Sequence, residues 1–234
     1  MAKPEPFPNA DLLWSAEQLH ARLEEEKLVV LDVRPSHQIM SGVIPGAAHF
    51  PLFRINPDRT TPELMAVMFD MYRLQFSLRG IAQDRTVVAY EQSQTGMIAC
   101  RAFWLLEYMG HRDVHVLDGG IAAWQAAGFE TVRELKPPTE RKLELRTRPE
   151  TFISADELNA ALGEDGLVVL DTRPDVEYLG KETRGGPRGG TIPGSVHLES
   201  GRYLDDTGRL KPPAELLALF ESQGVLRDKA IVPF

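Results

Sequence analysis

The sequence predicts an α/β protein of two tandem modules, each a parallel sheet flanked by helices, with the second lacking its C-terminal part. Three observations predict this fold class. The segment "SAEQLHARLEEEKLVVLDVRP" from Ser15 returns as "SADELNAALGEDGLVVLDTRP" from Ser154. Short apolar runs, typical of strands buried on both faces, alternate with helical segments along the chain. The two copies are spaced much further apart than solenoid repeats, so each copy is predicted to be a domain.

The first elements of the two copies match each other. Ser15 is followed three residues later by Gln18, which is the capping-box pattern at the start of a helix. Ser154 and Glu157 repeat this pattern in copy two. A short amphipathic helix and then the apolar run "LVVL" follow in each copy, so we expect a helix and a buried strand.

The later elements also correspond until copy two ends. The turn "GVIPGAAH" from Gly42 returns as "GTIPGSVH" from Gly190, and the extra residues of copy two fall in a predicted loop, "KETRGGPRGG". Next come the helices "ELMAVMFDMYRLQF" and "AELLALFESQG", and then the strands "TVVAY" and "AIVPF". Copy one continues with a helix "MIACRAFWLLEYMG", a strand "VHVL", a turn "DGG" and a helix "IAAWQAAGF", which copy two lacks.

These correspondences define the predicted domains. Residues 1–130 form a complete domain, and 149–234 form a domain that stops before the loop following its last strand. The segment 131–148 contains the proline-rich and charged stretch "ELKPPTERK", which is typical of a linker. Tyr90 aligns with Phe234 at the ends of the matching strands.

Composition limits the classes of partner. The net charge of −8 argues against nucleic acid as a partner, because phosphate binding requires a basic surface. No stretch approaches the roughly 18 apolar residues of a membrane helix. The N-terminal "MAKPEPFPNAD" lacks the apolar core of a secretory signal, so we expect a cytoplasmic location.

The sequence predicts neither a metal site nor a cofactor. Cys100 is the single cysteine, which excludes an intramolecular disulfide and a thiolate cluster. The six histidines show no paired spacing of the kind that metal sites use. Cys100 lies in a helix dense in apolar residues, so we expect a buried, inert thiol rather than a sulfur carrier.

Together, these motifs resemble a known family. The "LDxR" strand end, the "IPG" turns, the "VVxY" strand and the "VxVLDGGxxAW" ending are similar to the tandem rhodanese-type thiosulfate and 3-mercaptopyruvate sulfurtransferases. The resemblance covers nearly the whole chain from about Leu13. It implies a cysteine directly after the second-module strand. That cysteine takes a sulfane sulfur from a small anionic donor, becomes a persulfide, and passes the sulfur to a thiol or cyanide.

The resemblance assigns roles to particular positions. Glu91 occupies the nucleophile position of the first module, and a carboxylate cannot form a persulfide. In the second module this position is 235, the residue after Phe234, so the chain ending at Phe234 is expected to be inactive. The resemblance further implies that Arg184 and Arg188 bind the donor, although a solvated glycine-rich loop would also explain them. Glu177 lies where mercaptopyruvate-type members often carry an arginine, which slightly disfavours that donor.

Four further residues are expected to be structural. Asp32 and Asp171 end their strands, where a short carboxylate can cap a turn. Trp104 and Trp124 are expected in the core.

Three hypotheses explain a chain that ends at a predicted buried strand. The first is a product cut short, for instance by a frameshift or a nonsense codon. The second is a UGA codon after Phe234 that the cell reads as selenocysteine. The third is a non-catalytic binding module on a rhodanese-like fold; a phosphatase relative would need a cysteine and an arginine-ended loop that the chain lacks. The sequence also predicts a second domain of low stability.

Overall fold

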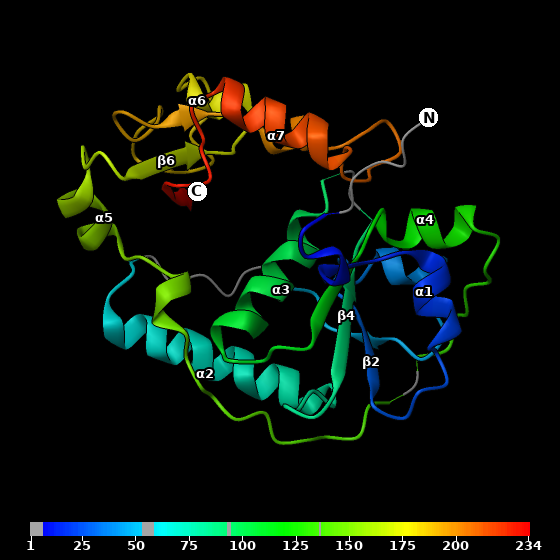
Figure 1. The fold of residues 1–234 in the computed structure, drawn as a ribbon. Helices are drawn as coiled ribbons and strands as arrows, with labels where there is room; N and C mark the ends of the chain where they lie inside the picture. Colours follow the sequence, from blue (N-terminus) through cyan, green and yellow to red (C-terminus); the bar gives the residue numbers. More distant parts are fainter. Residues whose placement is uncertain (1–6, 53–58, 93–94, 136) are drawn as a thin grey trace. The chain divides into compact units, whose positions relative to one another are not determined.

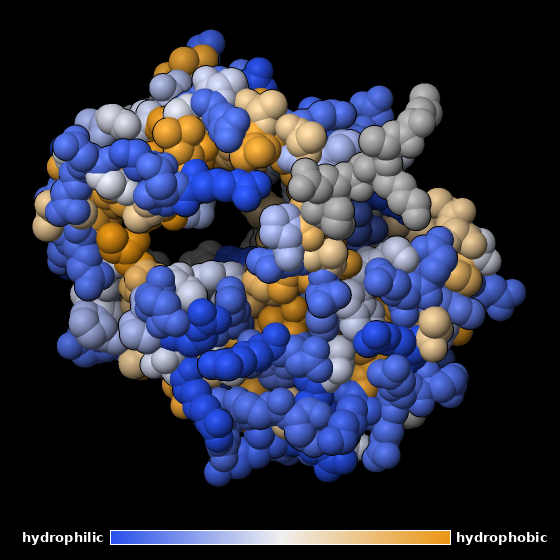
Figure 2. Space-filling model, viewed as in Figure 1, coloured by the Kyte–Doolittle hydropathy of each residue, from blue (hydrophilic) through white to orange (hydrophobic). Residues whose placement is uncertain are grey.

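The computed structural model describes residues 7–52, 59–92, 95–135 and 137–234. The chain divides into two compact units (Figure 1), a first unit of Pro8–Phe152 and a second that contains Ile153–Phe234. Hydrophilic residues cover most of the surface in view, with smaller hydrophobic patches between them (Figure 2). Within the described residues, no helix is long and apolar enough to cross a membrane.

The first unit contains a five-stranded parallel sheet. The strand order is β1-β5-β4-β2-β3. The strands are β1 (Leu13–Trp14), β2 (Leu28–Asp32), β3 (Ala48–His49), β4 (Thr86–Tyr90) and β5 (Val114–Leu117). Because all strands run in the same direction, their carboxyl ends meet at one edge of the sheet.

Helices cover both faces of this sheet. The α-helices are α1 (Ala16–Ala21), α2 (Pro62–Leu78), α3 (Met97–Tyr108) and α4 (Gly120–Ala126), and 3-10 turns span Ala10–Leu12, Gln38–Ser41 and Pro149–Thr151. Figure 1 shows α2 and α3 on one side of β2 and β4, with α1 and α4 on the other. Neighbouring residues of β2 enter opposite cores: Leu31 packs with the α2 and α3 side, and Val30 with the α1 and α4 side. This double burial explains the continuous apolar run in the sequence.

The capping boxes predicted from the sequence are confirmed in both units. The Ser15 backbone N–H donates to Gln18 Oε1 at 2.8 Å, and Gln18 N–H donates to Ser15 Oγ at 3.2 Å. In the second unit, Ser154 N–H donates to Glu157 Oε2 at 2.8 Å, and Glu157 N–H donates to Ser154 Oγ at 3.2 Å. The two repeats therefore start their first helix in the same way.

The segment predicted as a linker runs along the first unit. Arg141 N–H donates to Ser77 O at 3.0 Å, and Arg146 N–H donates to Met109 O at 3.0 Å. The Leu143 side chain is fully buried in the core beside α2 and α3. Because these contacts bind the segment to the first unit, the structural boundary between the units follows Phe152.

The second unit contains a three-stranded parallel sheet of order β7-β6-β8. Its strands are β6 (Leu167–Asp171), β7 (Val196–His197) and β8 (Ala230–Pro233), its α-helices are α5 (Ala155–Ala161), α6 (Asp175–Tyr178) and α7 (Pro213–Ser222), and a 3-10 turn spans Ser200–Tyr203. The cluster of buried side chains in its core is small and consists of Leu170, Leu198 and Val225. On the edge strand β8, Ile231 remains 42% exposed.

Candidate functional site

The ends of β4 and β8 occupy equivalent places in their sheets. Each strand pairs in parallel with the strand that carries the "LVVLD" repeat, β2 or β6. Tyr90 O accepts a hydrogen bond from Val33 N–H at 3.1 Å, and Phe234 O accepts one from Thr172 N–H at 3.0 Å. Tyr90 and Phe234 are therefore equivalent, as the sequence alignment of the two copies predicts.

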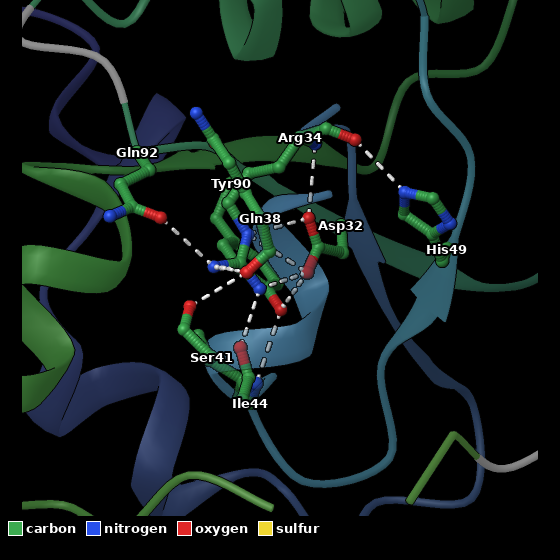
Figure 3. A network of polar contacts seen from close by, with 9 residues as sticks. Asp32, Arg34, Gln38, Ser41, Ile44, His49, Tyr90 and Gln92 are labelled. Atoms are coloured by element: carbon green, nitrogen blue, oxygen red, sulfur yellow. Dashed lines mark hydrogen bonds and ion pairs between the residues drawn. The ribbon is translucent and has the colours of Figure 1, made fainter. Parts of the chain in front are cut away.

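A buried ion pair lies beside this strand end in the first unit (Figure 3). Arg34 Nη2 lies 2.6 Å from Asp32 Oδ2, and the two side chains are 1% and 0% exposed. The same nitrogen donates to Gly42 O at 2.7 Å, which ties the strand end to the IPG turn. The Tyr90 hydroxyl donates to Asp32 Oδ2 at 2.6 Å and accepts from Ile44 N–H at 3.1 Å. Three segments of chain are thus joined around one carboxylate.

The second unit repeats this network with a different hydroxyl. Arg173 Nη2 lies 2.6 Å from Asp171 Oδ2 and donates to Gly190 O at 2.9 Å. Phe234 has no hydroxyl, and here Thr191 Oγ1 donates to Asp171 Oδ2 at 2.6 Å. The Arg173 guanidinium carbon lies 5.1 Å from the Phe234 ring centroid, as the Arg34 guanidinium carbon lies 5.5 Å from that of Tyr90. The strand supplies the hydroxyl in the first unit, and the turn supplies it in the second.

The predicted capping role of the two aspartates is confirmed. Arg34 N–H donates to Asp32 Oδ1 at 3.0 Å, and Arg173 N–H donates to Asp171 Oδ1 at 3.0 Å. No role was predicted for the two arginines from the sequence. Their signal was present, because the repeated stretches "LDVRP" and "LDTRP" both contain them.

In each unit, a histidine contacts the backbone carbonyl of the arginine in this network. His49 Nε2 lies 2.9 Å from Arg34 O, and His197 Nε2 lies 2.9 Å from Arg173 O. These contacts hold the loop after each aspartate against the neighbouring strand. Neither histidine was predicted to have a role, although "AAH" and "SVH" occur at matching positions of the two repeats.

The Asp171–Arg173 ion pair is charged at neutral pH. Burial alone would raise the pKa of Asp171, but hydrogen bonds from Arg173 and Thr191 outweigh burial and hold that pKa below its usual value. In the first unit, burial and then the Asp32 carboxylate raise the pKa of Tyr90 far above its usual value. The Tyr90 hydroxyl therefore stays protonated and remains a hydrogen-bond donor.

Glu91 directly follows β4 and is buried at the N-terminus of α3. Its Oε1 accepts hydrogen bonds from Ile98 N–H at 2.7 Å and Ala99 N–H at 3.3 Å. Its backbone carbonyl accepts from Ile121 N–H at 2.9 Å. The first unit therefore places an anionic side chain where the backbone N–H groups and the dipole of a helix favour negative charge.

The "DGG" turn packs against the same residue. A Cβ atom on Gly120 would lie 2.2 Å from Glu91 O, and Gly120 has φ +56°. Both the close approach and the left-handed backbone require glycine. This turn therefore packs directly against the backbone of the position after β4.

Of the two predicted donor-binding arginines, the structure brings one toward the end of β8. Arg184 Nε lies 2.5 Å from Glu177 Oε1, and Glu177 Oε2 lies 4.0 Å from Arg173 Nη1. Arg173 in turn covers the Phe234 ring. Arg188 is exposed, and we find no polar partner for its side chain among the described residues.

Cys100 does not match its expected burial. The residue is exposed on α3, because this helix is apolar around most of its circumference and periodicity does not identify its inner face. Although the residue has exposed surface, the protein packed around its thiol desolvates it, and this desolvation and then the Glu91 carboxylate raise the pKa of the thiol to about 11. The thiolate that sulfur transfer requires is therefore scarce at neutral pH.

The two tryptophans differ in burial. Trp124 is fully buried in the core and donates through Nε1 to Glu130 O at 2.9 Å. Trp104 is partly buried against the core, and its Nε1 donates to Thr151 O at 2.9 Å.

In the described ranges, no cluster of three or more histidine, cysteine or acidic side chains is arranged to hold a metal ion.

Comparisons with known proteins agree with this geometry. The family model for the rhodanese-like domain matches residues 15–127 and 154–232. A probable 3-mercaptopyruvate sulfurtransferase of Pseudomonas aeruginosa is 34% identical over 94% of this chain and 81% of that protein. A thiosulfate sulfurtransferase of Azotobacter vinelandii is 30% identical, over 97% of this chain and 83% of that protein.

The fold also resembles a solved structure. The crystal structure of SseA from Escherichia coli, a 3-mercaptopyruvate sulfotransferase, superposes with a TM-score of 0.81. The match covers 95% of this chain and 87% of that chain at 23% identity. This likeness confirms the expected α/β fold of two modules with parallel sheets flanked by helices.

Proposed function

The chain belongs to the rhodanese family, and we propose that the protein is a sulfurtransferase that moves a sulfane sulfur from thiosulfate or 3-mercaptopyruvate to a thiophilic acceptor. The observation that carries the proposal is the equivalence of the strand ends at Tyr90 and Phe234. Glu91 follows the first of these strands, so the equivalent position in the second unit is 235. We place the sulfur carrier there, as a cysteine or selenocysteine.

The first unit supports this assignment, because backbone N–H groups donate hydrogen bonds to the side chain at the equivalent position. Ile98 and Ala99 direct their N–H groups at the side chain of Glu91. Equivalent donors around a thiolate would lower its pKa and stabilise a persulfide anion. Glu91 itself offers no sulfur, so we propose that the first unit does not catalyse the transfer.

The proposed reaction has two balanced steps. The thiolate attacks the outer sulfur of thiosulfate, the S–S bond of the donor breaks, and its electron pair leaves with sulfite. With 3-mercaptopyruvate the C–S bond breaks instead, and pyruvate leaves after protonation of its enolate. Attack by cyanide or a thiolate on the outer persulfide sulfur then forms the product and restores the carrier thiolate.

We propose that Arg184 and Arg188 bind the anionic end of the donor. A guanidinium offers parallel N–H groups that match two oxygens of a sulfonate or carboxylate. Arg184 has the stronger support, because Glu177 and Arg173 connect it to Phe234. Arg188 lies in the same loop and would act as a second cation.

The test begins with the gene. We expect the reading frame after the Phe234 codon to encode a cysteine or an in-frame UGA codon, followed by a loop, a helix and a "DGG"-like turn. The protein made from that frame should form thiocyanate from thiosulfate and cyanide. Substitution of residue 235 by serine should abolish this activity. A frame without such a continuation, or activity that survives the substitution, would contradict the proposal.

One observation favours a second candidate function, a non-catalytic binding module. Glu91 fills the nucleophile position of the first unit with a buried, hydrogen-bonded carboxylate. A unit built in this way can present surfaces without chemistry, since fold does not determine activity. Thiocyanate formation by the purified protein would exclude this candidate.

A further inference from the structure

We propose that Glu177 is a positioning residue for the sulfur donor, which anchors Arg184 through Nε and leaves its two terminal nitrogens for the donor's oxyanion. This inference rests on the proposed function, because that proposal assigns donor binding to Arg184. It deepens the proposal by naming the residue that would preorganise the binding group.

The burial of Glu177 is the first observation. Its side chain is only 10% exposed, and an ionised carboxylate in that environment requires charged or hydrogen-bonding partners. Arg184 Nε lies 2.5 Å from Oε1, and Arg173 Nη1 lies 4.0 Å from Oε2. Among the described residues these two arginines are its ionic partners. Glu177 therefore links a fixed cation to a surface cation.

The backbone of Arg184 is the second observation. It has φ +45°, and no other non-glycine residue in the described ranges has positive φ. A side chain in this region is uncommon and costs conformational energy, so the surrounding loop must impose it. This backbone conformation accompanies the contact that the Arg184 side chain makes with Glu177 in α6. The outlier therefore falls on the residue whose orientation the inference concerns.

The loop that holds Arg184 is closed at its base. A Cβ atom on Gly189 would lie 2.5 Å from Gly180 O, so the two glycines bring the ends of the loop together. Within the loop, Gly186 N–H donates to Thr183 O at 2.8 Å. This closed base and internal turn restrict the paths that the chain can take around Arg184.

The guanidinium keeps its outer face open. Arg184 is 62% exposed, and it contacts Glu177 through Nε. A sulfonate or carboxylate can then accept two hydrogen bonds from Nη1 and Nη2. Because Glu177 already orders the arginine side chain, the donor does not have to order it on binding.

The anchor is connected to the end of β8. Arg173 contacts Glu177, pairs with Asp171 and stacks on Phe234. Arg184 is thus fixed relative to the strand end that precedes the proposed sulfur carrier. The equivalent of Glu177 in the first unit is Gln38, which is neutral, and that unit lacks the arginine-bearing loop.

Steady-state kinetics of the protein from the complete reading frame provide the first test. Glu177→Ala should raise the KM for thiosulfate about tenfold and leave kcat within about twofold, because only donor positioning is lost. Glu177→Gln keeps an acceptor for Nε–H and should stay within about threefold of the parent KM. Lys181→Gln removes an exposed charge from the same loop and serves as the matched control, with KM unchanged.

A double-mutant cycle separates positioning from a general structural effect. In an Arg184→Gln background, Glu177→Ala should cause no further rise in KM, because its effect passes through Arg184. Additive effects would overturn the inference. So would a lower KM in Glu177→Ala, which would mean that Glu177 masks Arg184 instead of presenting it. If Glu177→Ala does not fold, the same cycle with Glu177→Asp decides.

Sulfate binding distinguishes this inference from the proposed function. Sulfate carries the oxyanion but transfers no sulfur, so its dissociation constant can be measured in a protein that makes no thiocyanate. A tenfold weaker binding in Glu177→Ala and Arg184→Gln, but not in Lys181→Gln, would support the inference even if sulfur transfer fails. Equal sulfate binding in all variants, or none in the parent protein, would overturn it.

Discussion

The two units hold the same Asp–Arg pair at the same strand end, but they differ in how deeply it is buried and in which residue completes it. Arg34 is 1% exposed, whereas Arg173 is 31% exposed and reaches toward Glu177. In the first unit the pair joins a strand to a turn within a closed core. In the second unit it also leads to a surface loop that carries arginines. The same local framework therefore serves packing in one unit and a candidate binding site in the other.

The largest expected difference between the units follows removal of the aspartate. Asp32→Ala leaves the Arg34 charge buried without its partner, and we expect a loss of about 3–5 kcal/mol in the stability of the first unit. Asp171→Ala leaves Arg173 able to reach water, so the loss in the second unit should be smaller by about 2 kcal/mol. Hydrogen exchange resolved by unit measures both values. Equal losses would show that burial does not distinguish the two pairs.

The exchange of hydroxyl groups gives the second prediction. Tyr90→Phe removes the donor to Asp32 and the acceptor for Ile44 N–H, and should cost about 1–3 kcal/mol. Adding Val43→Thr copies the arrangement of Thr191 and should restore at least half of that loss. Urea unfolding followed by tryptophan fluorescence reports on the first unit, which contains Trp14, Trp104 and Trp124. No recovery in the double variant would mean that the two networks are not interchangeable.

The cores of the two units predict different rates of proteolysis. The buried core cluster of the second unit consists of three side chains, and β8 leaves Ile231 exposed. We expect protease to cleave 149–234 at least about ten times faster than the first unit, which corresponds to about 1.4 kcal/mol in opening free energy. Mass spectrometry of timed digests locates the cuts. Uniform resistance across both units would contradict the predicted low stability of the second.

The smallest expected difference between the units is in how their stability changes as the pH falls. Burial lowers the pKa of His111 in the first unit from its usual 6.5, so below that value the unfolded chain binds more protons and the first unit loses stability as pH falls. The pKa of Asp171 lies below its usual 3.8, so its contribution is complete above that value and disappears as pH falls further. The opening free energy from hydrogen exchange, corrected for the intrinsic pH dependence of amide exchange, should fall in the first unit between pH 7 and 5, and His111→Gln should flatten that fall. If His111→Gln keeps the parent's pH profile, the loss of stability in acid arises from a group other than His111.

The elements were predictable where one sequence pattern has one structural outcome. The capping boxes at Ser15 and Ser154 and the doubly buried "LVVL" strands form as expected, since both depend on local sequence. The position of Glu91 after β4 was predictable from the apolar run "TVVAY", and the equivalence of the two strand ends was predictable because the repeat aligns Tyr90 with Phe234. These features require only the order of residues along the chain.

Other features depend on contacts between distant segments. Arg34 reaches Gly42 across the IPG turn, and neither residue alone indicates that contact. The composition of 131–148 indicates a linker between the two copies, but it does not indicate that Leu143 and its neighbouring backbone groups find partners on the first unit. The exposure of Cys100 was missed because apolar residues surround α3, so the pattern does not define one buried face.

The exchange of hydroxyls also limits how the two repeats can recombine. A crossover between the IPG turn and the following strand would join the turn of one repeat to the strand of the other. One product would carry Thr191 with Tyr90, two hydroxyls directed at the same carboxylate oxygen, and the other would carry Val43 with Phe234 and no hydroxyl. Gene conversion that exchanges part of a module would therefore be less tolerated than exchange of a whole module. The sequences of the two copies would then stay different at these hydroxyl positions.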